Sequence, residues 1–178
     1  MEMQLLIAGF GGQGVLLLGT LLAKAAMMEG REVSWMPSYG PEMRGGEAHC
    51  AVVISDEPIG SPLVTEPGVL VALNRPGMVR FMPAMPAGGL LLHNSSLTHG
   101  VPLRDDIRAI PVPCNELAET LQTGRVANMI MLGALQAATN LVGNPALTAV
   151  LVDWLGDGEK ARLNEEALTL GRNVVNQG

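Results

Sequence analysis

Six residues near the N-terminus carry a pattern that is typical of phosphate binding. The run GFGGQG at positions 9–14 satisfies G-x-G-x-x-G and lies between an expected strand and an expected helix, the context that gives the pattern meaning. Backbone N–H groups at a helix start lack intrahelical partners, so they can hold an anion that glycines allow to approach closely. The candidate ligand-binding residues are therefore Gly9, Gly11, Gly12, Gln13 and Gly14.

Three interpretations of this glycine loop stay open. The glycines serve only a tight turn with close helix–sheet packing, or they bind a phosphate or pyrophosphate, or they form a turn that faces a partner chain. Binding of NAD or FAD in the usual way would also need an acidic residue at the end of the second strand. Here that strand ends in Ser34-Trp35-Met36-Pro37, which argues against an ordinary dinucleotide site.

A second candidate is Arg44, which two glycines follow in a loop bounded by prolines. A guanidinium on such a loop suits bidentate recognition of a carboxylate or a phosphate. Alternatively, Arg44 pairs with Glu42 or Glu47 and orders the loop, or it contacts another subunit. The candidate residues of this segment are Tyr39, Arg44, Gly45 and Gly46.

Other chemistry finds little support in the sequence. Two cysteines, Cys50 and Cys114, lie far apart, and the three histidines are scattered, so a disulfide framework, a four-cysteine iron–sulfur site and a structural zinc site are not indicated. The run GDG at positions 156–158 resembles the opening of a thiamine diphosphate motif, but the paired asparagines expected downstream are missing. We therefore assign neither a catalytic residue nor a metal ligand.

The elements that must position these loops alternate between strands and helices. Short apolar runs bounded by turn residues predict strands over residues 3–8, 32–36, 48–55, 69–73, 89–93 and 108–112. Apolar periodicity, caps and prolines predict helices over residues 15–29, 75–81, 115–121, 125–141, 145–155 and 159–176. We expect one α/β domain over residues 1–178: a Rossmann-like three-layer open sheet with a helical C-terminal third.

The connections predict the direction of the strands. A parallel crossover usually needs a dozen or more residues with a helix, but residues 37–47 and 56–68 are rich in proline or glycine and lack helical patterns. The third strand should therefore run antiparallel in a mostly parallel sheet, and the fourth should run parallel to the first. This arrangement brings residues 37–47 and residues 9–14 to the same carboxyl edge, where open α/β sheets bind ligands.

Composition narrows the classes of partner. The chain has 178 residues and a formal net charge of −6, so it lacks the basic footprint of a nucleic-acid or membrane-surface protein. Two long uncharged stretches are interrupted by glycines or by asparagine and proline, and the N-terminus has no basic region, so we expect no membrane span, no signal peptide and a cytoplasmic location. Only 16% of residues are charged while 48% are hydrophobic, which indicates a surface covered by another chain.

Several separated motifs together resemble one known family. GFGGQGVLLLGTLLAKAA, PSYGPEMRGGEAHCAVVIS, IGSPLV, VALN and GRVANMIMLGAL occur in this order within residues 1–138. They resemble the gamma subunit of 2-oxoacid:ferredoxin oxidoreductases. The sequence YGPE is more similar to the 2-oxoglutarate and related branches than to the indolepyruvate branch.

The resemblance implies a non-catalytic subunit of a complex that converts a 2-oxoacid, coenzyme A and oxidised ferredoxin to acyl-CoA, CO2 and reduced ferredoxin. Thiamine diphosphate and iron–sulfur clusters would lie in companion alpha, beta and delta chains. The gamma chain would hold no cofactor tightly but could contact coenzyme A, with the segments 9–14 and 39–46 as its matching motifs. We expect the isolated chain to be inactive and homodimeric. The alternative is a free-standing phosphate- or nucleotide-binding α/β protein.

Overall fold

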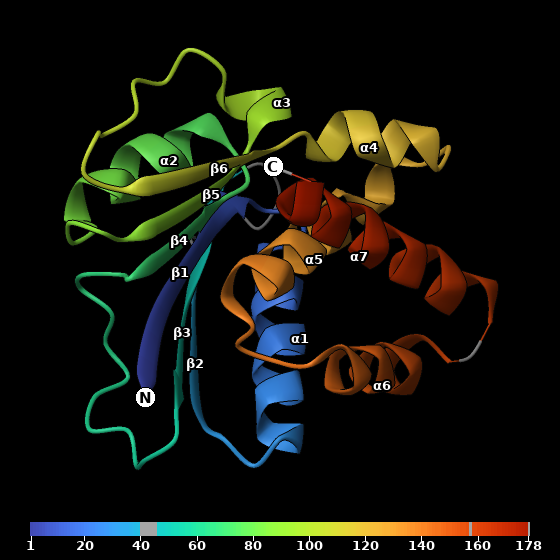
Figure 1. Cartoon of the computed structure of the whole chain (residues 1–178), viewed down its shortest axis with the longest axis horizontal. Helices are drawn as coiled ribbons and strands as arrows, with labels where there is room; N and C mark the ends of the chain where they lie inside the picture. The colour runs from blue at the N-terminus through green and yellow to red at the C-terminus, as the bar shows by residue number, and fades with distance from the viewer. Residues whose placement is uncertain (40–45, 157, 178) are drawn as a thin grey trace.

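Six strands of the described chain form one mixed sheet in the order β2-β3-β1-β4-β5-β6 (Figure 1). The computed structural model describes residues 1–39, 46–156 and 158–177. Strand β3 is antiparallel to both of its neighbours, and the other pairings are parallel, as the short connections predict. The strands are β1 (Glu2–Phe10), β2 (Glu32–Tyr39), β3 (Glu47–Ser55), β4 (Val69–Ala72), β5 (Leu90–Asn94) and β6 (Arg108–Val112).

The helices lie on both faces of this sheet, as a three-layer fold requires. Helices α1, α5, α6 and α7 gather on one face, whereas α2 and α3 lie on the other (Figure 1). The helical elements are α1 (Val15–Met28), α2 (Arg75–Phe81), η1 (Met82–Ala84), α3 (Ser95–Thr98), α4 (Cys114–Thr120), η2 (Gly124–Val126), α5 (Ala127–Thr139), α6 (Asn144–Leu155) and α7 (Glu159–Gln177).

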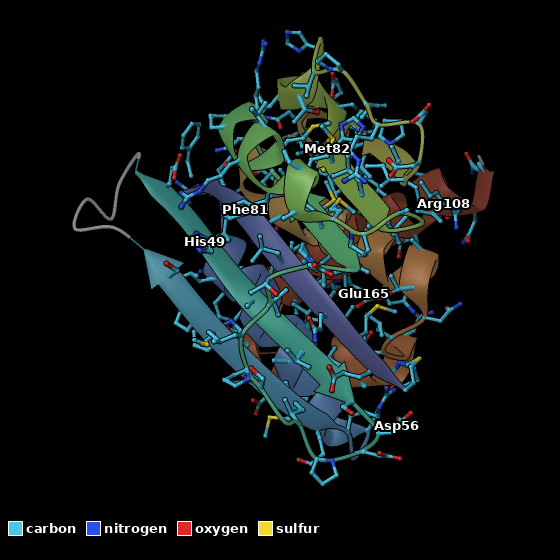
Figure 2. All side chains as sticks on the ribbon, turned by 90° about the vertical axis from the view of Figure 1, so that its left-hand side faces the viewer. His49, Asp56, Phe81, Met82, Arg108 and Glu165 are labelled. Carbon is cyan, nitrogen blue, oxygen red and sulfur yellow. The ribbon has the colours of Figure 1, made fainter. Side chains whose placement is uncertain are left out.

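The two faces bury cores of different size. The larger core fills the space between the sheet and α1, α5, α6 and α7, where Leu5, Ile7 and Val71 are fully buried. The smaller one lies under α2 and η1 and contains Leu6, Leu70, Ala72, Met78, Met82, Met85 and Leu91. Figure 2 looks onto this second face, where β2 and the adjoining part of β3 have no helix in front of them. The third layer therefore covers only part of the sheet.

Helix α1 connects the glycine loop to the edge of the sheet. Its apolar residues face β2 and β3 on one side and α6 on the other. Helix α1 is thus buried on more than one side, as its lack of a polar face predicts. The helix ends at Met28 with Glu29 as its C-cap, and Gly30 follows with a φ of 77° and donates its N–H to the Met27 carbonyl at 3.0 Å. This is the glycine termination that the sequence predicts.

Strand β2 is longer than the sequence predicts. We expected it to end at Met36, because Pro37 follows, but the pairing continues through Pro37, Ser38 and Tyr39, which lie opposite Cys50, His49 and Ala48. The prediction was wrong because β2 is an edge strand, where a proline costs no ladder hydrogen bond if its nitrogen faces outward. The extension brings the start of the Arg44 segment closer to the carboxyl edge.

Helices α5 and α7 cross with their backbones in contact. A Cβ atom added at Gly171 would lie 1.8 Å from the Ile130 carbonyl oxygen, and one added at Gly133 would lie 2.0 Å from the Leu168 carbonyl oxygen. Both glycines are therefore required by close approach. Since α5 follows directly on η2, this crossing fixes the position of the residues that η2 and the first turn of α5 present to the sheet edge.

Candidate functional site

The glycine loop joins the end of β1 to the start of α1 through two left-handed residues. Gly12 has a φ of 97° and Gly14 has a φ of 78°, and residues that carry a side chain rarely adopt such backbone angles. Gln13 closes the loop: its Oε1 accepts the Phe10 N–H at 2.7 Å, and its Nε2 donates to the Leu73 carbonyl at 3.3 Å. These bonds order the loop and tie it to Leu73, which directly follows β4, while a ligand role for Gln13 stays a prediction.

Gly9 and Gly14 also meet their neighbours closely. A Cβ at Gly9 would lie 2.8 Å from Val15 Cγ2, and one at Gly14 would lie 2.2 Å from Asn128 Nδ2. By contrast, a Cβ at Gly12 would meet no atom within 4 Å among the described residues. The loop therefore serves close packing at its two ends and leaves its middle open.

The start of α1 has the features of an anion site. Gly14 occupies the N-cap position without a side-chain cap, and the first turn contains no acidic residue. The first N–H groups of a helix have no intrahelical acceptor, and the helix dipole adds partial positive charge there. These N–H groups are accordingly available to a ligand at the carboxyl edge of the sheet.

A crevice of about 170 Å³ opens beside this helix start, where the chain turns from β1, β4 and β5. Helix α1 leaves β1 toward one face and α2 leaves β4 toward the other, so the crevice lies at the topological switch point of the sheet. The polar or loop residues that line it are Gly12, Gln13, Asn94, Asn115, Arg125 and Asn128.

One wall of the crevice is internally hydrogen-bonded, and we call Gln13, Asn94 and Asn115 the holding wall. Asn94 is 2% exposed; its Nδ2 donates to Asn115 Oδ1 at 2.8 Å and its Oδ1 accepts the Cys114 N–H at 3.3 Å. Asn115 donates its own N–H to Ser96 Oγ at 3.1 Å. These amides join β5 to the start of α4 and keep the edge in shape.

The opposite wall is different, and we call Arg125 and Asn128 the open wall. Asn128 is only 8% exposed, and no hydrogen bond joins its side chain to another described residue; its amide atoms are not among the buried polar atoms that lack a partner, so they face the open space of the crevice. Arg125 is exposed and forms no ion pair within the described part of the chain. An amide that faces a crevice and is not occupied by a protein group can donate to a ligand oxygen through its nitrogen and accept through its oxygen. The open wall therefore suits an anionic ligand with hydrogen-bond acceptors.

A second hollow of about 300 Å³ adjoins the crevice at Gly12. It is lined mostly by apolar atoms of the loop and of the first turn of α1, including Phe10, Val15 and Leu16. A ligand with a charged group at the helix start could thus extend an uncharged arm over the other side of the loop.

The second predicted segment is described only at its ends. Arg44 and Gly45 lie outside the described residues, and so does the side chain of Tyr39. Gly46 is described: its carbonyl accepts the Gly11 N–H at 2.9 Å. This bond confirms that the two segments meet at the same edge of the sheet, while a ligand role for Arg44 stays a prediction.

The open wall is the part of the site that sequence reasoning missed. Asn128 is one of two amides in the mostly apolar helix α5, the other being Gln136, and Arg125 precedes that helix in the run GRVANMIML. These polar residues were a usable signal, but only the packing of α5 against Gly14 shows that Asn128 lies at the site.

The titratable groups near the core do not add a reactive centre. Burial raises the pKa of the Cys50 thiol to about 12 and also raises the pKa of Cys114, so both thiols stay protonated at neutral pH. Burial lowers the pKa of His93, which forms a hydrogen bond with Thr98 through Nδ1 at 2.6 Å.

No group of three or more potential metal ligands occurs among the described residues. In the same part of the chain, no helix is long and apolar enough to cross a membrane.

Known proteins resemble this chain over most of its length. Residues 4–174 match the family described as pyruvate ferredoxin/flavodoxin oxidoreductase. The ketoisovalerate oxidoreductase subunit VorA of Methanothermobacter marburgensis is 49% identical over 76% of this chain, which spans only 28% of the length of that relative. The 2-oxoglutarate synthase subunit KorC of the same organism is 36% identical over 100% of this chain and 99% of its own length.

Two solved structures share the fold. The gamma subunit of a keto/oxoacid ferredoxin oxidoreductase from Geobacter sulfurreducens superposes with a TM-score of 0.84 at 27% identity, covering 99% of both chains. A 2-oxoglutarate:ferredoxin oxidoreductase from Magnetococcus marinus, solved with 2-oxoglutarate, coenzyme A and succinyl-CoA, superposes with a TM-score of 0.92 at 26% identity. The match covers 99% of this chain and 31% of that one.

Proposed function

The chain belongs to the pyruvate ferredoxin/flavodoxin oxidoreductase family, and from that premise we propose that it is the gamma subunit of a 2-oxoacid:ferredoxin oxidoreductase. The observation that carries this proposal is the near-complete overlap, in both directions, with the gamma subunit from Geobacter sulfurreducens and with KorC. The complex would oxidatively decarboxylate a 2-oxoacid, most simply 2-oxoglutarate or a branched relative, with coenzyme A. All 178 residues would form one domain of it.

Within that complex, the crevice at the switch point would receive part of coenzyme A. Coenzyme A combines phosphate groups with a long, weakly polar arm. The helix start at Gly14, Arg125 and the unpartnered Asn128 amide fit the phosphates, and the adjoining hollow beside Gly12 fits the arm. When bound, coenzyme A supplies the thiol that accepts the acyl group. The residues named here would bind and orient it.

Thiamine diphosphate and the iron–sulfur clusters would lie in partner subunits. A four-iron or two-iron cluster is normally held by four cysteines, whereas this chain has two, and both are buried in separate elements. The donor set of this chain therefore does not fit a cluster. We propose alpha and beta subunits, and a delta subunit where clusters need a separate chain, as the partners, with ferredoxin reached through the complex. Reduced, buried thiols also suit a cytoplasmic location.

The isolated chain would self-associate as a homodimer. Large apolar side chains lie exposed at the end of α1 and on β2, where a companion chain would otherwise cover them: Met27, Met28, Trp35 and Met36. Multi-angle light scattering of the purified chain should report a dimer, and a monomer that persists at high concentration would contradict this part of the proposal.

Co-purification tests the proposed function. A tagged chain purified from its native extract should bring down companion chains that contain thiamine diphosphate and iron, and the eluate should reduce ferredoxin when given a 2-oxoacid and coenzyme A. The tagged chain alone should not. Recovery of the chain without thiamine diphosphate or iron would favour a free-standing phosphate-binding protein instead.

A further inference from the structure

A third cavity, of about 410 Å³, lies where α1, η2, α5, α6 and α7 meet. Its size falls within the range of pockets that hold small ligands. It shares Arg125 and Asn128 with the crevice, so the two openings adjoin at the open wall. Nothing in the proposed role of the glycine loop explains this cavity, because none of its lining residues belongs to that loop or to a strand.

An aromatic side chain and an apolar floor form one part of this cavity. Trp154, at the end of α6, lines it although 48% of the side chain is exposed. Leu17, Met129 and Leu163 contribute apolar surface from three other helices. An indole that is half exposed at the mouth of a pocket offers a flat face on which an aromatic base can stack.

Two cations form the other part. Arg125 comes from η2 and Lys160 from the first turn of α7, and neither has an ion-pair partner in the described part of the chain. No aspartate or glutamate occurs among the described lining residues, although the chain as a whole carries a charge of −6. Lys160 is also one of only two lysines in the sequence. The cavity is therefore locally positive although the whole chain is negative, and this local charge favours an anionic ligand.

Asn128 supplies the polar contact between these parts. Asn128 is 8% exposed, lines both cavities, and forms no side-chain hydrogen bond to another described residue; its amide atoms therefore face the cavities. Such an amide can donate to a phosphate or ribose oxygen and accept from an exocyclic amine. An indole face, two cations and an unpartnered amide together match a purine nucleotide.

We propose that the cavity of Arg125, Trp154 and Lys160 binds an adenosine phosphate, with the adenine on Trp154 and the phosphate between the two cations. Two kinds of molecule could supply this adenosine phosphate group: coenzyme A, through its adenosine phosphate end, or a free adenine nucleotide. Only the first source rests on the proposed function, because it requires the rest of coenzyme A to pass Asn128 into the crevice. The second would act as a regulator of the same subunit.

Fluorescence of Trp154 tests the site directly. The Trp35→Phe variant leaves Trp154 as the only tryptophan of the full chain. Adenosine 3′,5′-bisphosphate should quench it saturably with a Kd of about 1 mM or lower, and inorganic phosphate alone should not. A linear response without saturation would overturn the proposal.

Substitutions identify the contacts. In the Trp35→Phe background, Lys160→Ala and Arg125→Ala should each raise the Kd about tenfold, whereas Lys24→Ala, which removes the other lysine from the exposed side of α1, should not change it. Trp154→Leu, measured by calorimetry, should also raise the Kd about tenfold. If the lysine variants are indistinguishable, the proposed cation contact is wrong.

Competition separates the two sources and the two proposals. If coenzyme A binds more tightly than ADP and competes with adenosine 3′,5′-bisphosphate, the source is coenzyme A; if ADP or ATP binds more tightly, the source is a free nucleotide. If coenzyme A binds but Trp154 does not respond and Lys160→Ala has no effect, the adenosine site is refuted while the crevice proposal stands. Saturable quenching by the bisphosphate in a chain that never joins an oxidoreductase complex would refute only the proposed function.

Discussion

The two walls of the crevice bury similar amides but use them differently. Asn94, on the holding wall, is bonded to the backbone of α4 and to Asn115, so its polar atoms are occupied by the protein itself. Asn128, on the open wall, is nearly as buried and has no partner among the described residues. This difference in hydrogen bonding separates the amide that holds the edge of the sheet in shape from the amide that remains able to bind a ligand.

The walls also depend on different supports. The holding wall is supported by the strands and by the Gln13 side chain, which joins the glycine loop to Leu73 directly after β4. The open wall is carried by η2 and α5, which are held in place by the glycine-to-backbone crossing with α7. A change that disturbs one support should leave the other wall largely in place, and this permits the following tests.

The largest effect should come from the support of the open wall. Gly171→Ala would place a methyl group 1.8 Å from the Ile130 carbonyl oxygen, which α5 can relieve only by moving. We expect a loss of about 3 kcal/mol in the free energy of unfolding, measured by urea denaturation. Gly60→Ala is the control, because an added Cβ there meets no described atom within 4 Å, and it should change stability by less than about 0.5 kcal/mol. Equal effects would contradict the close crossing.

The next effect compares the walls themselves. Asn94→Ala leaves the Cys114 N–H without its acceptor and Asn115 Oδ1 without its donor, so we expect it to cost about 2 kcal/mol. Asn128→Ala breaks no hydrogen bond to a described residue and should cost under about 1 kcal/mol. Parallel urea titrations of the two variants measure this. Similar losses for both would show that Asn128 is also structural.

A smaller effect is expected at the open middle of the loop. Gly12→Ala meets no neighbouring atom but must adopt a φ of 97°, so only backbone strain of about 1 kcal/mol should result. Thermal unfolding checks the stability, and binding of coenzyme A should weaken if the loop must stay uncovered. A loss well above this value would indicate contacts that the loop is not expected to make.

A pH-dependent effect is expected at His93, which precedes Asn94 of the holding wall. Thr98 Oγ1 donates to the Asn94 carbonyl at 2.7 Å, so it accepts from His93 Nδ1–H, and the buried Nε2 has no partner among the described residues. Burial lowers the pKa of His93 in the folded state, so the unfolded chain binds more protons. Stability should therefore be fully present above the ordinary histidine pKa of about 6.5 and fall as the pH drops below it, by at most about 1.4 kcal/mol per pH unit.

Urea midpoints between pH 7.5 and pH 5 should show this slope in the parent chain and a shallower one in His93→Gln. A residual slope is expected, because burial and the neighbouring Arg80 also lower the pKa of His49, which stacks against Phe81 (Figure 2). An identical slope in the variant would remove His93 from the explanation.

Much of the fold follows from local sequence signals. Short connections without helical pattern were enough to reverse β3, and the G-x-G-x-x-G run was enough to place the loop between β1 and α1. The extension of β2 past Pro37 was not predictable locally, because it depends on β2 lying at the edge of the sheet. The α5–α7 crossing was missed for a related reason: Gly133 and Gly171 have meaning only once the two helices are in contact.

The site was predicted less completely than the fold. The glycine loop and the carboxyl edge came from the sequence, and the bond from Gly11 to Gly46 joins the two predicted segments. The internal hydrogen bonds of Gln13 and the open wall did not come from the sequence, and the residues of the open wall lie more than a hundred positions away from the loop. Which polar residues keep a partner depends on long-range packing, and a motif does not contain that information.

The central claim is that the crevice of this subunit receives coenzyme A through its open wall. The most direct test is the steady-state kinetics of the assembled complex carrying Asn128→Asp, which puts a negative charge where the phosphates should lie. The apparent KM for coenzyme A should rise about tenfold or more, while the KM for the 2-oxoacid stays the same. An unchanged KM for coenzyme A, or an equal rise in both, would contradict the claim.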